Sequence, residues 1–281
     1  MTGRVLPFIG SNGEWATGIK TAAATCQLAP NPSPWTLDGT NTWVLQAPGE
    51  TAAIIVDPGP SDERHLREVV EQVAARDGRI TSILLTHGHV DHSEGARRLS
   101  ELTGAPVRAV DPTHRHGGEG LAAGDVVTAG ELELRVIVTP GHSSDSVCFL
   151  LPDEGSLLTG DTVLGRGTTV VAWPDGRLSE YLVSLENLRD LAERSGVERI
   201  LPGHGPILEA PGAILTAYLE HRMARLDDIR DAVAGGAGST ADVVAIVYAN
   251  SPRELWPAAE LSVRAQLEYL RDGGEIGAEI C

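Results

Sequence analysis

Three histidines and an aspartate fall within seven residues, in the segment Thr86-His87-Gly88-His89-Val90-Asp91-His92. Imidazole and carboxylate groups together suit Zn²⁺, with manganese or iron as alternatives. His87 and His89 lie two residues apart on an extended loop, so their rings can point toward one metal ion. Asp91 and His92 are offset along the same turn and can reach a second ion. The spacing therefore predicts a metal centre.

Three further residues with ligand side chains follow predicted strand ends downstream. His142 comes after Pro140-Gly141, Asp161 after Thr159-Gly160, and His204 after Pro202-Gly203. In open α/β folds, ligands gather at the ends of strands. Each residue alone would be more typical of a turn. Together with the segment 86–92, they complete two coordination shells.

Short apolar runs alternate with helical patterns, and this alternation predicts the elements that position the site. Residues 80–85 form an apolar strand that leads directly into Thr86. Ser61 is the expected N-cap of a helix with an apolar face. The order of elements indicates a layered α/β domain over residues 1–210. The predicted strands are 42–46, 52–56, 80–85, 107–110, 132–138, 147–151, 156–159 and 200–201, and further helices are predicted over 95–102 and 179–194.

The remainder, residues 211–281, predicts a second domain made of helices. A long helix is expected over 214–233, with Leu219, Met223, Leu226 and Ile229 on its apolar face. Ser239 is the expected cap of a helix over 240–248, and Pro257 begins a third helix with Val263, Leu267 and Leu270 inward. Three helices and a short tail predict a small winged-helix module.

The ligand motifs resemble those of the metallo-β-lactamase superfamily, over roughly residues 40–210. The resemblance implies a four-layer αβ/βα sandwich with the metals at one edge. It also implies that Asp57 orients histidine ligands, and that Asp91 both binds metal and carries a proton. The implied ligands are His87, His89 and His142 for the first metal ion, and Asp91, His92 and His204 for the second, with Asp161 bridging the two.

Two positions differ from true β-lactamases, because His92 stands where many have arginine and Asp161 where they have cysteine. A narrower resemblance is to the β-lactamase-like protein 2 group, which joins the hydrolase domain to a winged helix. Residues 39–42, 141–145 and 167–169 carry this resemblance, together with the stretch from Leu255-Trp256-Pro257 to Leu270. That group includes an endoribonuclease, and its relatives include thioesterases that release polyketides from carrier proteins.

Three functions are consistent with these residues. The first is hydrolysis of a small or carrier-bound ester or thioester by a hydroxide held between two metal ions, most simply two Zn²⁺. The second is endoribonuclease cleavage of single-stranded RNA. The third is a non-enzymatic regulator, which the complete ligand set disfavours. The charge balance favours the first function over the second, because the net charge is -17 and Lys20 is the sole lysine.

Charge and hydropathy also limit the partners that we expect. From Pro211 onward, eleven acidic residues face six arginines, so we expect no duplex DNA binding and instead a lid or homodimer element. No run of about eighteen apolar residues is present, so we expect no membrane span. Residues 1–10 lack a secretory pattern, which predicts a cytoplasmic protein.

The remaining histidines carry no ligand motif. His65 and His221 fall on predicted helices among charged residues, so both are expected at the surface. His114 and His116 share a loop with proline and glycine, and we expect no functional role for them. Thr168 and Thr169 are candidates for pocket lining or for purely structural positions, and Trp35 and Trp173 for pocket walls or core.

Overall fold

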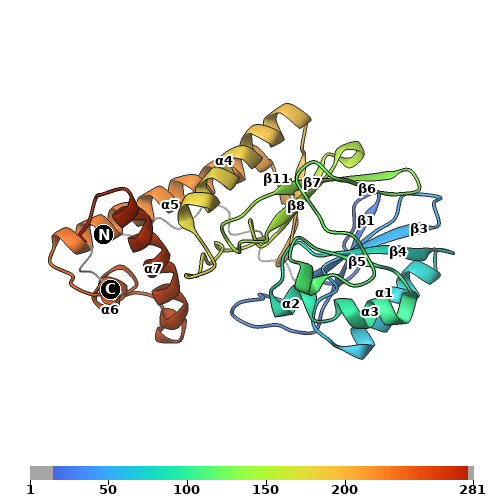
Figure 1. Ribbon diagram of the computed structural model, residues 1–281, viewed down its shortest axis with the longest axis horizontal. Helices are drawn as coiled ribbons and strands as arrows, with labels where there is room; N and C mark the ends of the chain where they lie inside the picture. The colour runs from blue at the N-terminus through green and yellow to red at the C-terminus, as the bar shows by residue number, and fades with distance from the viewer. Residues whose placement is uncertain (1–14, 278–281) are drawn as a thin grey trace.

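Two β-sheets face each other across a shared apolar core, and helices cover the outer face of each sheet (Figure 1). This computed structural model describes residues 15–277. In the first sheet the strand order is β1-β2-β3-β4-β5, with β1 to β3 antiparallel and β3 to β5 parallel. Its strands are β1 (Ala24–Leu28), β2 (Asn41–Leu45), β3 (Ala52–Val56), β4 (Arg79–Leu84) and β5 (Val107–Arg108).

The second sheet has the order β11-β10-β9-β8-β7-β6, and only β9 and β10 run parallel. Both sheets are therefore mixed. Its strands are β6 (Val126–Ala129), β7 (Leu132–Val138), β8 (Val147–Leu151), β9 (Ser156–Gly160), β10 (Arg199–Pro202) and β11 (Leu208–Glu209).

The alternation of side chains along β2 shows how the layers form. Trp43 and Leu45 point into the core between the two sheets, where they join Phe149 of β8. Val44 points the other way, into the core beneath α1 (Glu63–Ala74) and α3 (Ala96–Thr103). Successive residues of a strand face opposite sides, so a fully apolar strand can serve two cores at once.

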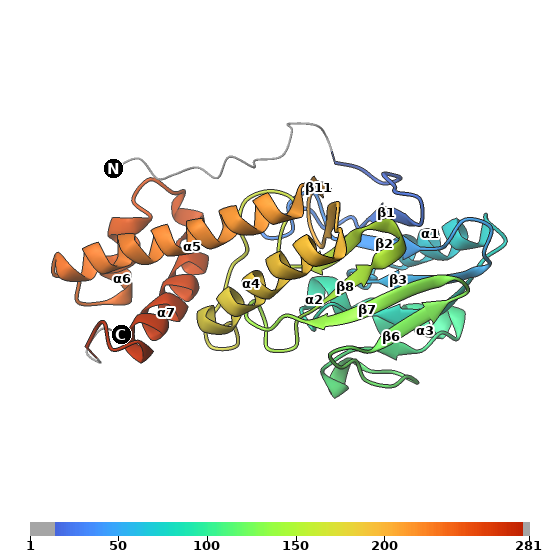
Figure 2. The same ribbon diagram turned by 90° about the horizontal axis from the view of Figure 1, so that it is seen from above.

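The outer face of the second sheet is covered by α4 (Leu178–Ser195) and the start of α5 (Pro211–Ala234) (Figure 2). Cys148 of β8 and Leu185 of α4 are both fully buried in this core. Burial raises the pKa of the Cys148 thiol to about 11, so this cysteine is an inert core residue. The layers are thus helix, sheet, sheet, helix, which confirms the predicted αβ/βα sandwich.

The helical C-terminal region extends beyond the sandwich at one end of the molecule (Figure 1). It comprises the distal part of α5, with α6 (Thr240–Val247) and α7 (Trp256–Asp272). The Ser239 side chain accepts a hydrogen bond from the Asp242 backbone, which confirms this residue as the cap of α6. Val263, Leu267 and Leu270 of α7 are buried as predicted.

Several sequence-based expectations were wrong in detail. The N-cap of α1 is Asp62, which accepts from the His65 backbone, and not Ser61. Met223 is 44% exposed, so the buried face of α5 is rotated away from it. His65 is buried, and its Nε2 lies 3.0 Å from Thr42 Oγ1. Strands β1 and β6 were not predicted at all.

Within residues 15–277, no helix is long and apolar enough to cross a bilayer. The expectation about a secretory pattern in residues 1–10 falls outside the described residues.

Candidate metal centre

Loops that leave one edge of the two sheets carry all the predicted ligands. The first sheet supplies Asp57 after β3 and the histidine-rich segment after β4, whose last residues form the single turn α2 (Val90–Ser93). The second sheet supplies His142 after β7, Asp161 after β9 and His204 after β10. Facing sheets thus bring residues from five parts of the chain to one place.

Ring nitrogens and carboxylate oxygens converge there in three groups. His87, His89 and His142 offer atoms that lie within 4.8 Å of one another, and Asp91, His92 and His204 form a second such group. Within the first group, His89 Nδ1 is 3.0 Å from both His87 Nε2 and His142 Nε2. These two groups have the same members as the two ligand sets that the family resemblance implied, and the third group joins His87 and His92 to Asp161.

Asp161 lies between the two triads. Its Oδ1 is 3.4 Å from the Nε2 atoms of both His92 and His204, and its Oδ2 is 3.7 Å from His142 Nε2. Oδ1 is buried and has no hydrogen-bond partner within the described range 15–277. A buried carboxylate oxygen without a donor, surrounded by converging imidazoles, fits a cation. Asp161 therefore lies within reach of both triads.

The opposite nitrogen of most of these rings is held by the surrounding chain. His142 Nδ1 donates to the Val170 carbonyl oxygen at 2.8 Å, and His204 Nδ1 donates to the Gly39 carbonyl oxygen at 3.1 Å. His92 Nδ1 lies 2.9 Å from Asp57 Oδ2. Such contacts fix the tautomer and leave Nε2 free for a metal.

The hydroxyl of Thr86 extends this support to His87. Thr86 Oγ1 donates a hydrogen bond to Asp57 Oδ2 at 2.7 Å and lies 3.0 Å from His87 Nδ1. The hydroxyl oxygen can therefore accept a hydrogen bond from the imidazole N–H of His87. Asp57 therefore positions His92 directly and His87 through Thr86. Its backbone has φ of 52°, a left-handed conformation that costs a non-glycine residue about 1–3 kcal/mol. Hydrogen bonds from the Thr86 backbone and side chain hold it there.

Two glycines allow the ligand loops to approach closely. A side chain on Gly203 would meet Asp161 Oδ1 and His92 Cε1, each at 2.8 Å. Gly141 has φ of 134°, and a Cβ there would lie 2.3 Å from the Tyr181 backbone nitrogen. The glycines that precede His142 and His204 in the sequence are thus required by the tight packing of the site.

Charge in the cluster is balanced between rings and carboxylates. Burial holds the pKa of His87 well below its usual value, with the neighbouring His92 adding to the effect. Burial also lowers the pKa of His204, but the charge of Asp161 and the hydrogen bonds to Asp161 and Asp91 together outweigh burial and raise that pKa to about 9. His204 and His92 overcome the opposite effect of burial and hold the pKa of Asp161 well below its ordinary range. Asp161 is therefore an ionised ligand.

The other histidines lie outside this cluster, although two of them, His65 and His221, are less exposed than the sequence predicted. His116 is exposed, while the His114 ring lies against Gly88, where an added Cβ would be 2.4 Å from its Nε2. His221 is half-buried and lines a cavity, so the expected surface position was wrong. Sequence reasoning also missed the role of Thr86 and the two carbonyl oxygens that orient His142 and His204. No side-chain pattern marks a carbonyl group in advance.

Comparison with known proteins places this geometry in a wider context. The family model "Metallo-beta-lactamase superfamily" matches residues 35–204, and "Beta-lactamase associated winged helix domain" matches residues 239–278. The Beta-lactamase-like protein 2 homolog of Drosophila melanogaster is 34% identical over 89% of this chain and 88% of its own. The Atrochrysone carboxyl ACP thioesterase of Aspergillus fumigatus is 30% identical, covering 87% of this chain and 78% of that one.

Solved structures show the same architecture over nearly the whole chain. A beta-lactamase domain protein from Burkholderia ambifaria superposes with a TM-score of 0.78, 27% identity and coverage of 97% of this chain and 93% of the other. A metallo-beta-lactamase family protein from Thermus thermophilus gives a TM-score of 0.74 at 23% identity, with 91% and 95% covered. Since motif, fold and overall sequence agree, this chain belongs to the metallo-beta-lactamase superfamily and carries a C-terminal winged-helix region.

Proposed function

We propose that this chain hydrolyses ester or thioester bonds of a small or carrier-bound substrate, with two metal ions, zinc in the native protein. The observation that carries the proposal is the pair of ligand triads with Asp161 between them. One relative is named as a thioesterase acting on an acyl carrier protein, which supports thioester chemistry for this chain. When bound, a metal pair supplies an activated water and polarises the substrate's carbonyl oxygen.

The residues around the centre supply the other requirements of hydrolysis. Asp91 is the most exposed carboxylate of the cluster, with 26% of its side chain accessible against 13% for Asp161. Burial raises its pKa, but the hydrogen bond from His204 and the charges of His92 and His204 together outweigh burial and lower it. An ionised and partly accessible carboxylate can accept a proton at its oxygen and pass it to the leaving group.

The rigid surroundings hold the ligands in place before a substrate arrives. Asp57, Thr86 and two carbonyl oxygens each hold a ring nitrogen, so the imidazoles need not reorient during turnover. The role of Asp57 is therefore positioning, because its carboxylate contacts His92 and Thr86.

The proposal is tested on protein expressed with zinc. We expect about two equivalents of metal per chain, and loss of hydrolysis on treatment with a chelator. Activity is then measured on an acyl thioester, an aryl ester, a lactone and single-stranded RNA. Turnover of the thioester or ester without RNA cleavage is the expected result. Cleavage of RNA alone would replace the proposal with the endoribonuclease function, and metal below about half an equivalent would refute the binuclear centre.

A further inference from the structure

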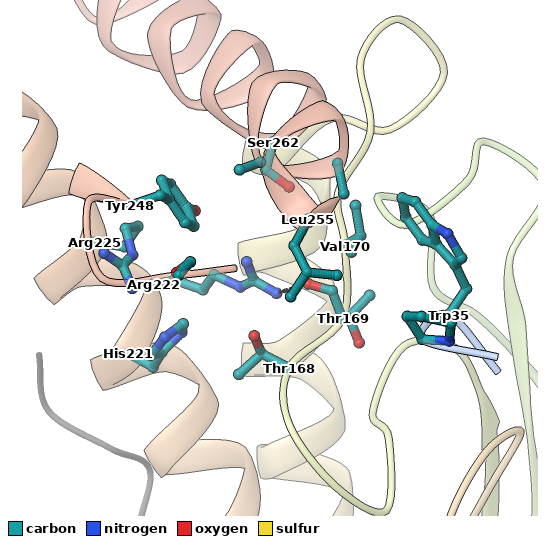
Figure 3. Close-up of a pocket in the computed structure, with 14 residues that line it drawn as sticks. Trp35, Thr168, Thr169, Val170, His221, Arg222, Arg225, Tyr248, Leu255 and Ser262 are labelled. Carbon is teal, nitrogen blue, oxygen red and sulfur yellow. Dashed lines mark hydrogen bonds between the residues drawn. The ribbon is translucent and has the colours of Figure 1, made fainter. Parts of the chain in front are cut away.

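A second feature of the molecule lies beside the metal centre. A cavity of about 260 Å³ opens between the sandwich and the C-terminal helices (Figure 3). We call it the arginine cavity and define it by Trp35, Thr169, Val170, Arg222, Arg225 and Leu255 among its lining residues. It draws on the loop at residue 35, the segment 168–170, helix α5 and the C-terminal region.

The charge of this cavity is opposite to that of the protein. Arg222, Arg225 and His221 line it, and none of its 14 lining residues, all within the described part of the chain, is acidic. The chain as a whole has a net charge of -17. A concave site with two guanidinium groups and no carboxylate in its wall concentrates positive potential.

Arg222 is buried to an unusual degree for an arginine, with only 4% of its surface exposed. Its guanidinium donates to the Thr169 carbonyl oxygen and lies 5.0 Å from the centre of the Tyr181 ring. No hydrogen-bond partner for its Nε exists within residues 15–277. Burying a cation without a counter-ion is costly, so an anion bound in the cavity would supply the negative charge that stabilises the Arg222 guanidinium.

Arg225 adds a second cation that is accessible to a ligand. Its guanidinium lies 4.8 Å from the centre of the Tyr248 ring, and it pairs at 3.1 Å with Asp228, which is 53% exposed. An exposed ion pair of this kind is weak, so Arg225 can exchange its partner at little cost. Burial, and after it the charges of Arg222 and Arg225, lowers the pKa of His221 to about 4, so this imidazole is neutral at pH 7 and the positive charge of the cavity comes from the two arginines.

One wall of the cavity is a segment that also forms hydrogen bonds with candidate metal ligands. Thr169 Oγ1 donates to the Asp161 carbonyl oxygen at 2.7 Å, and the Val170 carbonyl oxygen accepts from His142 Nδ1 at 2.8 Å. The segment that faces Arg222 is thus bonded on its other side to two candidate metal ligands. The candidate metal ligands and the arginines therefore contact the same segment, Thr169 and Val170.

The remaining wall is apolar and partly open. Trp35 is 54% exposed and Leu255 is 37% exposed, which is high for such large hydrophobic side chains. Both line the cavity with Val170, and Figure 3 shows Trp35 across the cavity from the arginines. Apolar surface beside paired guanidinium groups fits a ligand with a carbon chain and one anionic end.

We propose that the arginine cavity binds an anionic group, a carboxylate or a phosphate, carried by the substrate whose ester or thioester bond reaches the metal centre. The assignment to a substrate rests on the proposed hydrolase function, whereas anion binding by the cavity does not. Arg222 and Arg225 donate hydrogen bonds to the anion, and Trp35 and Leu255 contact the adjoining carbon chain.

The first test measures binding without turnover. Chelator-treated protein is titrated by calorimetry with inorganic phosphate and, separately, with succinate, so that no metal can hold the anion. We expect saturable binding of at least one probe, weakened about tenfold or more in Arg222→Gln and Arg225→Gln. The matched control is Arg230→Gln on the same helix, whose side chain pairs with Glu275 outside the cavity.

The outcomes of this titration decide the binding site. Absence of saturable binding, or equal affinity in all variants, would overturn the proposal. Preference for phosphate or for succinate identifies the anion. If Arg222→Gln does not fold because its contact with Thr169 is lost, then Arg225→Gln decides, since Arg225 has 21% of its side chain accessible.

The second test concerns the substrate. Metal-loaded protein is compared on two substrates that differ in one charged group. The pair is a succinyl thioester and the same thioester with its free carboxylate methylated, or a thioester of a phosphorylated thiol and the thioester of the same thiol without the phosphate. We expect a preference of about tenfold in kcat/KM for the anionic member, abolished by Arg225→Gln and retained in Arg230→Gln. Equal kcat/KM for both members would overturn the substrate assignment. If no thioester is hydrolysed at all, the hydrolase proposal fails while the titration still decides anion binding.

Discussion

At the scale of single residues, the position of Asp161 separates it from every other ligand candidate. Its carboxylate oxygens lie within 3.7 Å of rings in both triads, whereas the carboxylate of Asp91 lies near His92 and His204 of its own triad. We expect Asp161→Ala to lose most bound metal and nearly all hydrolysis, because both ions lose a charged ligand. His116→Ala, a change at an exposed histidine, should retain both. Equal losses of metal in the two variants would show that the cluster is misplaced.

Thr86 offers a sharper prediction, because its hydroxyl joins Asp57 to His87. Thr86→Val keeps the shape of the side chain but removes the hydroxyl, so His87 loses its acceptor and Asp57 loses a donor. We expect metal affinity to fall by about 10- to 100-fold, as for other residues that orient metal ligands. Thr86→Ser restores the hydroxyl and should restore the affinity. Competition with a metal chelator of known affinity measures both.

Residue type and spacing were enough to predict which side chains meet at this site. The segment 86–92 and the residues after strand ends contain the groups that meet in space. The groups that orient them could not be predicted in the same way. The carbonyl oxygens of Gly39 and Val170 depend on the path of the chain, and any residue type supplies such an oxygen. Arg222 is similar, since its burial follows from how α5 crosses the segment 168–170.

At the scale of elements, strands made mostly of apolar residues were predicted best. The strands β3, β7 and β8 have the bounds expected from their apolar runs. Strand β6 was missed because it is four residues long and alternates between exposed and buried positions, a weak pattern. Strand β1 contains Thr25 and Gln27, whose polar side chains hide the pattern although both are buried.

The register of α5 shows why helical periodicity alone was insufficient. Several faces of this helix carry apolar residues, and packing decides which are buried. Leu226 is fully buried in the core shared with α7, whereas Met223 is 44% exposed. We expect Leu226→Ala to lower the free energy of unfolding by about 2–5 kcal/mol. The matched change Met223→Ala should lower it by less than about 0.5 kcal/mol. Urea unfolding monitored by circular dichroism compares them, and equal effects would contradict the observed register.

At the scale of the whole molecule, one apolar core joins the sandwich to the winged-helix region. It runs from Leu157 of the second sheet through Leu185 of α4 and Leu226 of α5 to Val263 of α7. Continuous burial of this kind packs the two regions against each other in the part of the chain that the structure describes. The arginine cavity lies where they meet, so the winged-helix region contributes directly to the surroundings of the metal centre.

This arrangement bears on whether the winged-helix region reads duplex DNA. Its basic side chains are largely engaged elsewhere, since Arg222 and Arg225 line the cavity and Arg264 pairs with Glu260 at 2.7 Å. Arg230 pairs with Asp227 and Glu275. DNA affinity grows with the number of phosphates that cations neutralise, and paired arginines among eleven acidic residues form no continuous basic stripe.

We therefore expect the full chain to bind duplex DNA no more tightly than about 10⁻⁴ M at physiological salt, the weak end of nonspecific binding. Fluorescence anisotropy of a labelled duplex, measured at low and at physiological salt, provides the test. Metal is kept bound during the titration so that the comparison applies to the active protein. Submicromolar binding that weakens steeply with salt would contradict this prediction, because it requires unpaired arginines on the surface. It would indicate that the winged-helix region binds nucleic acid.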